Sequence, residues 1–101
     1  MKNTLRKIAH ARSGDKGSNV NIGVIAYTQA GYEILEKKLT ADVVQAYFSA
    51  LGLKSVTRYE LPNLLAFNFV LHGVLGKGGS RSLRLDPQGK VLGQILLDMP
   101  F

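Results

Sequence analysis

The sequence predicts an α+β domain in which helices cover one face of an antiparallel sheet. Two segments, 19–27 and 65–75, alternate apolar and polar residues, as is typical of strands that bury one face. Residues 40–52, between them, instead repeat their apolar residues at helical spacing. Strands on both sides of a helical segment favour a two-layer sandwich.

The first two strands are expected to form a hairpin. Leu5 to Ser13 is a strand of mixed polarity, and Asn19 to Tyr27 is a strand that buries Val20, Ile22, Val24 and Ala26. The residues between them, Gly14-Asp15-Lys16-Gly17-Ser18, are rich in turn formers. We therefore predict an elaborated turn there.

Two helices follow. Gly31 to Leu39 is a short helix rich in Glu and Lys. Thr40 is suited to cap a second helix, with Asp42 in its first turn and Gly52 as its C′ residue. The apolar stripe of this second helix comprises Val43, Val44, Tyr47, Phe48 and Leu51.

The second half contains two or three further strands. Leu53 to Leu61 is a strand that Pro62 stops. In the strand Leu65 to Leu75, one face carries Leu65, Phe67, Phe69, Leu71 and Leu75, and the other carries Ala66, Asn68, Val70, His72 and Val74. A glycine loop, Gly76-Lys77-Gly78-Gly79-Ser80, precedes another short strand, Arg81 to Leu85.

The C-terminal segment allows two interpretations. Asp86-Pro87 is a good helix start, and Val91, Leu92, Ile95, Leu96 and Met99 recur at helical spacing. Asp86-Pro87-Gln88-Gly89 is also good turn chemistry and would form a hairpin. We favour the helix, which completes a two-layer sandwich of the ferredoxin-like type.

Length and composition exclude several classes of protein. With 101 residues, 46% hydrophobic and 20% charged, residues 1–101 fit one globular domain. No apolar run is long enough to span a membrane, and the basic N-terminus lacks the apolar stretch of a signal peptide, so we expect a cytoplasmic protein. Because there is no cysteine, disulfides, thiol catalysis and thiolate metal sites are excluded. No cofactor is expected.

The net charge of +6 is concentrated in two segments. Between residues 18 and 76, four basic residues are matched by four acidic ones, so the excess lies in residues 1–17 and 77–90. Each segment includes a glycine-bearing loop. If the fold brings them together, they form an electropositive patch for an anionic partner.

The segment from His10 to Gly23 departs most from ordinary packing. Glycines at 14 and 17 allow a positive φ and bare N–H groups, as in an anion-binding nest, and Arg12 and Lys16 add charge. Asn19 and Asn21, two apart on a strand, lie on the same side. The alternative is a polar hairpin turn in which Asp15 and Ser13 bond their own backbone.

The sequence also resembles a known family. The run Ala11-Arg12-Ser13-Gly14-Asp15-Lys16-Gly17, followed by Asn21-Ile22-Gly23-Val24-Ile25-Ala26, resembles the C-terminal domain of the AtuA-like proteins of acyclic terpene utilisation. So do Arg58-Tyr59-Glu60-Leu61-Pro62-Asn63-Leu64, Phe67-Asn68-Phe69-Val70-Leu71, and Ser82-Leu83-Arg84-Leu85-Asp86 with Gly89-Lys90. The resemblance covers nearly the whole chain.

The resemblance implies a ferredoxin-like α+β domain that usually follows a larger N-terminal domain. We therefore expect a stand-alone small subunit that joins a separately encoded large AtuA-type subunit. The resemblance also implies a role in catabolism through CoA thioesters, without assigning a catalytic residue. Ser18 stands where an acidic residue is expected after Gly17, which argues against a metal site in this loop.

The first functional hypothesis is an accessory subunit that binds an anionic group, such as an acyl-CoA phosphate or a carboxylate, or the surface of a large subunit. The candidate binding residues are Arg12, Ser13, Gly14, Asp15, Lys16, Gly17, Asn19, Asn21, Asn63, Asn68 and Arg81.

The second hypothesis is a small enzyme. His10 or His72 would act as general acid or base, with Asp15 orienting it and Arg12 or Lys16 stabilising an oxyanion or enolate.

The third hypothesis is a structural or oligomerisation module, since Ala66, Val70, Val74, Ile25 and Tyr27 leave the second sheet face partly apolar. A homo-oligomer fits this surface. Nucleic-acid binding is disfavoured, because no basic helix or aromatic stacking strand is evident. Metal binding is disfavoured because His10, His72 and Asp15 lack paired ligand spacing.

Overall fold

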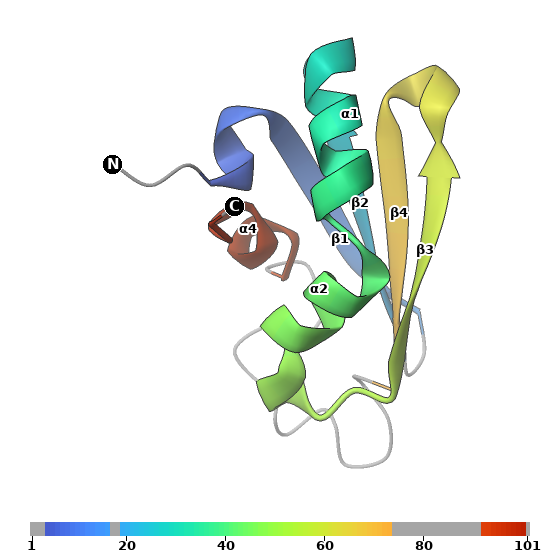
Figure 1. Cartoon of the computed structure of the whole chain (residues 1–101). Helices are drawn as coiled ribbons and strands as arrows, with labels where there is room; N and C mark the ends of the chain where they lie inside the picture. The colour runs from blue at the N-terminus through green and yellow to red at the C-terminus, as the bar shows by residue number, and fades with distance from the viewer. Residues whose placement is uncertain (1–3, 17–18, 74–91, 101) are drawn as a thin grey trace.

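A computed structural model describes residues 4–16, 19–73 and 92–100. Its elements, in chain order, are η1 (Leu5–Lys7), β1 (Ala9–Lys16), β2 (Asn19–Ala26), α1 (Gln29–Lys38), α2 (Ala41–Tyr47), η2 (Ser49–Leu51), β3 (Ser55–Leu61), η3 (Pro62–Leu64), β4 (Ala66–His72) and α4 (Leu92–Leu97). The α+β class is confirmed. Helices α1, α2 and α4 lie over the same face of the sheet (Figure 1).

The four strands form an antiparallel sheet in the order β1-β2-β4-β3. On the face beneath the helices, Val24 lies between Ala11 and Phe67, and Ile22 lies opposite Phe69. The alternation predicted for β2 and β4 is confirmed, because their inward residues are buried and the others are not fully so, apart from Ala66. The largest fully buried side chains are Phe67, Phe69, Leu5, Ile22, Leu35, Leu39, Leu71, Leu96, Val20, Val24 and Val44.

The first two helices, α1 and α2, are each capped at their start by a threonine. The hydroxyl oxygen of Thr40 accepts a hydrogen bond from Val43 N at 3.2 Å, which confirms the predicted cap of α2. Thr28 does the same for α1 by accepting from Gly31 N at 3.0 Å. Helix α1 therefore begins two residues before the predicted start at Gly31. Gly52, with φ of 69°, ends the 3-10 turn η2 that follows α2.

The N-terminal strand prediction was wrong for its first residues. Leu5–Lys7 is a 3-10 turn rather than a strand. The reason is a tertiary contact: the side chain of Leu5 is buried, and its backbone N donates to Met99 O at 3.2 Å. The chain therefore turns at this point to pack on the C-terminal segment.

The predicted turn at 14–18 is shorter than expected. Gly14, Asp15 and Lys16 continue β1, opposite Asn21, Val20 and Asn19 respectively. Only residues 17 and 18 separate the two strands. Pairing with β2 over the full length of the hairpin thus overrides the turn propensity of the sequence.

The strands β3 and β4 are shorter than predicted. Leu65 has a φ of 54°, a left-handed conformation that cannot continue a strand, so β4 begins at Ala66. At the other end, Gly73 has a φ of 84° and follows the last strand residue, His72. Strand β3 begins at Ser55 rather than Leu53. The predicted strand 81–85, the glycine loop 76–80 and the alternatives at 86–89 lie outside the described residues.

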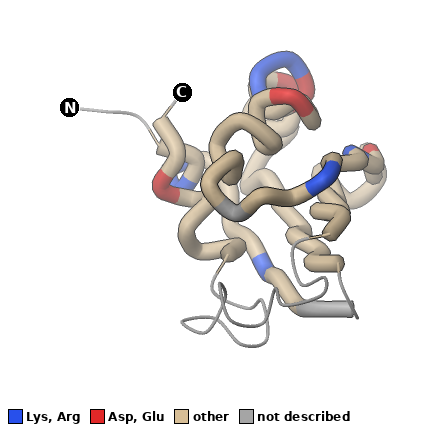
Figure 2. The backbone as a smooth tube through the Cα atoms, turned by 90° about the horizontal axis from the view of Figure 1, so that it is seen from below, with Lys and Arg blue, Asp and Glu red and all other residues tan. Residues whose placement is uncertain are grey.

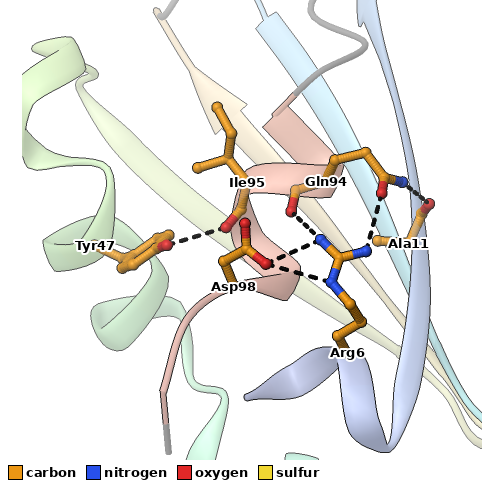
Figure 3. Close-up of polar contacts among 6 residues, drawn as sticks. All are labelled: Arg6, Ala11, Tyr47, Gln94, Ile95 and Asp98. Atoms are coloured by element: carbon orange, nitrogen blue, oxygen red, sulfur yellow. Dashed lines mark hydrogen bonds and ion pairs between the residues drawn. The ribbon is translucent and has the colours of Figure 1, made fainter. Parts of the chain in front are cut away.

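Helix α4 confirms the helical spacing predicted from Leu92 to Leu96, while the predicted start at Asp86-Pro87 lies outside the described residues. The contacts of α4 join it to the N-terminal turn and to α2 (Figure 3). Arg6 forms an ion pair with Asp98 at 3.0 Å and donates to the carbonyl oxygen of Gln94 at 3.2 Å. The hydroxyl of Tyr47 in α2 donates to the carbonyl oxygen of Ile95 at 3.0 Å. These contacts hold α4 between the N-terminal turn and α2.

Candidate functional site

The candidate site is the sheet face that helices α1, α2 and α4 leave uncovered, which we call the open face. Residues directly opposite one another in an antiparallel ladder point to the same side. The register therefore places three complete rows on this face: His10, Ile25, Ala66 and Leu61; Arg12, Gly23, Asn68 and Tyr59; Gly14, Asn21, Val70 and Thr57. Asn19, His72 and Ser55 extend the face at one end.

Two hollows lie on the open face and join. The apolar hollow, about 770 Å³, is lined by Gly23, Ile25, Tyr59, Leu61, Leu64, Ala66, Phe67 and Asn68. The polar hollow, about 320 Å³, is lined by Arg12, Ser13, Gly14, Asn21, Gly23, Ile25 and Asn68. Because Gly23, Ile25 and Asn68 belong to both, the two hollows form one continuous depression with a polar end and an apolar end.

Three polar side chains surround the polar end. Arg12 is exposed, while Asn21 and Asn68 are half-buried. None of the three side chains has a hydrogen-bonding partner among the described residues. Arg12 and Asn68 flank Gly23 on neighbouring strands, so their Cα atoms are about 10 Å apart with no side chain between them.

This arrangement suits a planar group with negative charge or a carbonyl oxygen. A guanidinium offers two parallel N–H donors to a carboxylate, and each carboxamide offers an NH₂ group. The three rows of the open face contain no aspartate or glutamate that would oppose an anion. The polar hollow is therefore chemically suited to an acyl head group.

The other predicted site residues differ in their relation to this hollow. Ser13 lines the polar hollow, but its hydroxyl oxygen accepts from Gly93 N at 2.9 Å on the helix-covered side. Asn19 Oδ1 accepts from Gly73 N at 3.2 Å at the end of the sheet. Asn63 is exposed in η3, beside Leu64 at the apolar end. Gly17 and Arg81 lie outside the described residues.

The predicted anion nest is not formed at Gly14. A nest requires backbone N–H groups turned by a positive φ. Gly14 is instead in the β1–β2 ladder opposite Asn21, and its φ is not positive. The backbone of Asp15 and Lys16 continues the same ladder. Gly14 contributes to the polar hollow by the absence of a side chain.

The two histidines belong to different contacts. His10 stacks on Tyr27, with ring centres 5.6 Å apart, and lines neither hollow. His72 shares a hydrogen bond of 2.9 Å with the hydroxyl of Thr57. Asp15 lies five residues from His10 on one extended strand, about 17 Å along it. The structure therefore does not bring together the His10–Asp15 pair considered for catalysis.

The apolar half of the site includes residues that sequence reasoning did not select. Tyr59, Leu61 and Leu64 line the apolar hollow and are 52%, 41% and 65% exposed. The alternation of Tyr59 and Leu61 on β3 was a usable signal, but it is weak without the partner strand, and Leu64 lies in η3 beyond that strand. The sheet order, with β3 beside β4, brings Tyr59 and Leu61 to the same hollow as Ile25 and Ala66.

The described charges do not gather in one patch. Figure 2 shows the described Lys and Arg residues at several separate places along the chain, some beside Asp or Glu. The predicted meeting of the two basic segments involves residues 77–90, which lie outside the described residues. Among the described residues that line the polar hollow, Arg12 is the one that supplies positive charge.

Residues 4–16, 19–73 and 92–100 contain no group of three His, Cys, Asp or Glu side chains placed to hold a metal ion. Among the helices that the structure describes, none has the length and apolar character needed to cross a membrane.

The fold and this open, half-polar sheet face define a small α+β domain with a surface suited to binding. The family model of the AtuA ferredoxin-like domain matches residues 3–101. The chain belongs to this family, which confirms the resemblance seen in the sequence. No curated protein and no solved structure matches it significantly.

Proposed function

We propose that the open face binds an acyl compound, either a free carboxylate or its coenzyme A thioester, and that the chain acts as a binding subunit. The observation that supports this most is the continuity of the two hollows through Gly23, Ile25 and Asn68. An acyl compound has the same division, with a polar carbonyl head next to a hydrocarbon chain.

In this proposal the head group lies at the polar end. Arg12 supplies the charge, and Asn21 and Asn68 supply amide donors for a carboxylate or thioester oxygen. A hydrogen bond to a charged group contributes about 1.5–3 kcal/mol, which corresponds to roughly tenfold to hundredfold in affinity.

The hydrocarbon chain lies in the apolar hollow. Ile25, Leu61 and Leu64 present apolar surface there, and Tyr59 forms a wall. Removing apolar surface from water contributes about 25 cal/mol per Å². The hydrocarbon chain of the ligand therefore supplies most of the affinity, while the head group fixes the position of the ligand.

Calorimetric titration tests this proposal with octanoate, octanoyl-CoA and coenzyme A alone. Binding of octanoate or octanoyl-CoA, weakened about tenfold or more in Arg12→Gln, is expected. Lys37→Gln is the matched control, since it removes an exposed positive charge from α1, away from the open face. If neither acyl compound binds, or if both variants lose affinity equally, the proposal is wrong.

The three ligands also separate the sources of the signal. Octanoate binding with no gain from the thioester assigns the site to a carboxylate. A stronger signal with octanoyl-CoA than with octanoate assigns it to the thioester. If coenzyme A alone binds as tightly as octanoyl-CoA, the protein recognises the nucleotide part of the ligand and not the acyl group. This result would contradict a role for the hollows.

A protein partner is the second candidate for the open face. Tyr59 on this face is 52% exposed, and Tyr27, which stacks on His10, is 59% exposed. Tyrosine and arginine are enriched in interface cores. The partner expected from the family is a large AtuA-type subunit, and a second copy of the chain is the alternative. Light scattering of the purified chain, alone and mixed with such a subunit, distinguishes them, and Leu64→Asp should weaken either complex.

A further inference from the structure

Gly23 occupies a position at which neither the backbone nor the packing requires glycine. It lies in the interior of β2, and its φ is not positive. A Cβ atom built at this residue would meet only Arg12 O, at an ordinary contact distance of 3.9 Å. Glycine inside a strand weakens it, so its presence there calls for a different explanation.

The surroundings of Gly23 supply that explanation. It lies between Arg12 and Asn68 in the middle row of the open face, and it lines both hollows. Because Gly23 has no side chain, no atoms project from the sheet at the point where the polar hollow meets the apolar hollow. Glycine in a strand interior often marks such a close approach of a ligand.

The geometry points to Gly23 as a specificity-determining residue: it keeps open the passage through which the carbonyl end of an acyl ligand continues into its hydrocarbon chain. This inference rests on the proposed function. A side chain at position 23 separates the two hollows. Ligands that occupy both are then excluded, while a ligand that occupies only the polar hollow is still accepted.

The test is a graded series, Gly23→Ala and Gly23→Val, compared with the wild type. Valine has a high strand propensity, so Gly23→Val should raise the midpoint of thermal unfolding. The same variant should bind octanoate about tenfold or more weakly, the loss expected when roughly two methylene groups lose their contact. A more stable protein that binds less well cannot be explained by unfolding.

Acetate and Val70→Ile serve as controls. Acetate fits the polar hollow alone, and its binding, followed by NMR shifts of the Arg12 and Asn21 amides, should persist in Gly23→Val. Val70→Ile adds a methylene group on the open face at a residue that lines neither hollow, and it should leave octanoate affinity unchanged.

The outcomes separate this inference from the proposed function. Unchanged octanoate affinity in Gly23→Val, with binding in the wild type, overturns the role of Gly23 alone. If Gly23→Val loses acetate binding together with octanoate binding, the new side chain fills the polar hollow, and the proposed role of Gly23 in the passage is wrong. If Gly23→Val does not fold, Gly23→Ala must show an intermediate loss of octanoate affinity. If the wild type binds neither octanoate nor octanoyl-CoA, both proposals are wrong.

Discussion

The hydroxyl oxygen of Ser13 in β1 accepts a hydrogen bond of 2.9 Å from the backbone nitrogen of Gly93 in α4. The two residues are far apart in sequence, and their contact brings the C-terminal helix against the sheet at close range. A Cβ atom at Gly93 would lie 3.1 Å from Ser13 Oγ and 3.3 Å from the backbone carbon of Arg12. A Cβ atom here would thus be crowded, and the helix or the sheet would have to shift by a few tenths of an ångström to accept it.

Gly93→Ala should therefore destabilise the protein by about 1–3 kcal/mol, as overpacking does. An exposed helix glycine would behave in the opposite way, because alanine is about 1 kcal/mol better in helices. Urea unfolding of the wild type and of the variant measures whether the free energy of unfolding falls or rises. A stabilised variant would contradict the close packing of α4 on β1.

Arg58 in β3 holds the end of helix α1 and should be important for stability. Its guanidinium donates to Leu39 O at 3.0 Å and Glu36 O at 3.1 Å, pairs with Glu60 at 2.7 Å and lies 4.8 Å from the centre of the Phe67 ring. Arg58→Met, which keeps much of the apolar stem, should lower the free energy of unfolding by about 2–4 kcal/mol.

Arg58→Lys should recover only part of this loss, because an ammonium group cannot reproduce the planar fork of donors. Lys37→Met, at an exposed position on α1, is the control and should change the free energy of unfolding by no more than about 0.5 kcal/mol. Equal effects of Arg58→Met and Lys37→Met in chemical denaturation would contradict the structural role of Arg58.

The ion pair between Arg6 and Asp98 should contribute much less. Both side chains are substantially exposed, at 49% and 66%. A double-mutant cycle of Arg6→Ala and Asp98→Ala should give a coupling free energy of about 1 kcal/mol or less, and this coupling should fall in high salt. A coupling of several kcal/mol that salt leaves unchanged would show that the pair is more buried than the structure describes.

Tyr32 should make stability depend on pH in the alkaline range. Its ring stacks on Phe67 at 4.7 Å, and burial, followed by the carboxylates of Glu60 and Glu36, raises the pKa of its hydroxyl above the ordinary 10.0, with Arg58 opposing. The unfolded chain then ionises at a lower pH than the folded one. The stabilisation is fully present below the ordinary pKa and is lost as the pH rises toward the raised value.

Unfolding measured between pH 8 and roughly pH 11 checks this, since tyrosine ionises near pH 10. Tyr32→Phe should show a smaller decline in the free energy of unfolding than the wild type. Tyr59→Phe, which replaces a tyrosine that is 52% exposed, is the matched control and should follow the wild type. A decline that is the same in all three proteins would rule out a contribution from Tyr32.

Much of the fold could be predicted because single strands and caps carry local signals. The alternation of β2 and β4 fixes which residues face the helices, and Thr40 marks the start of α2. The errors arose where distant contacts decide the conformation. Leu5–Lys7 forms a 3-10 turn because Leu5 packs on the C-terminal segment, and Gly14 belongs to β1 because Asn21 pairs with it.

The candidate site was predicted in part for the same reason. Arg12, Gly14, Asn21 and Asn68 were selected from sequence, and the structure gathers them in the polar hollow. Ser13 was also selected and lines the polar hollow, but its hydroxyl contacts α4 on the helix-covered side. The apolar half depends on the order of strands in the sheet, which local patterns do not specify.

The most direct test of the account is an NMR titration of the labelled chain with octanoate. The proposed site predicts that the largest amide shifts map to Gly23, Ile25 and Asn68, where the two hollows meet, and that shifts on α1 and α2 are small. Shifts confined to the helix-covered side, or no saturable shifts with either octanoate or octanoyl-CoA, would contradict the claim that the open face binds an acyl ligand.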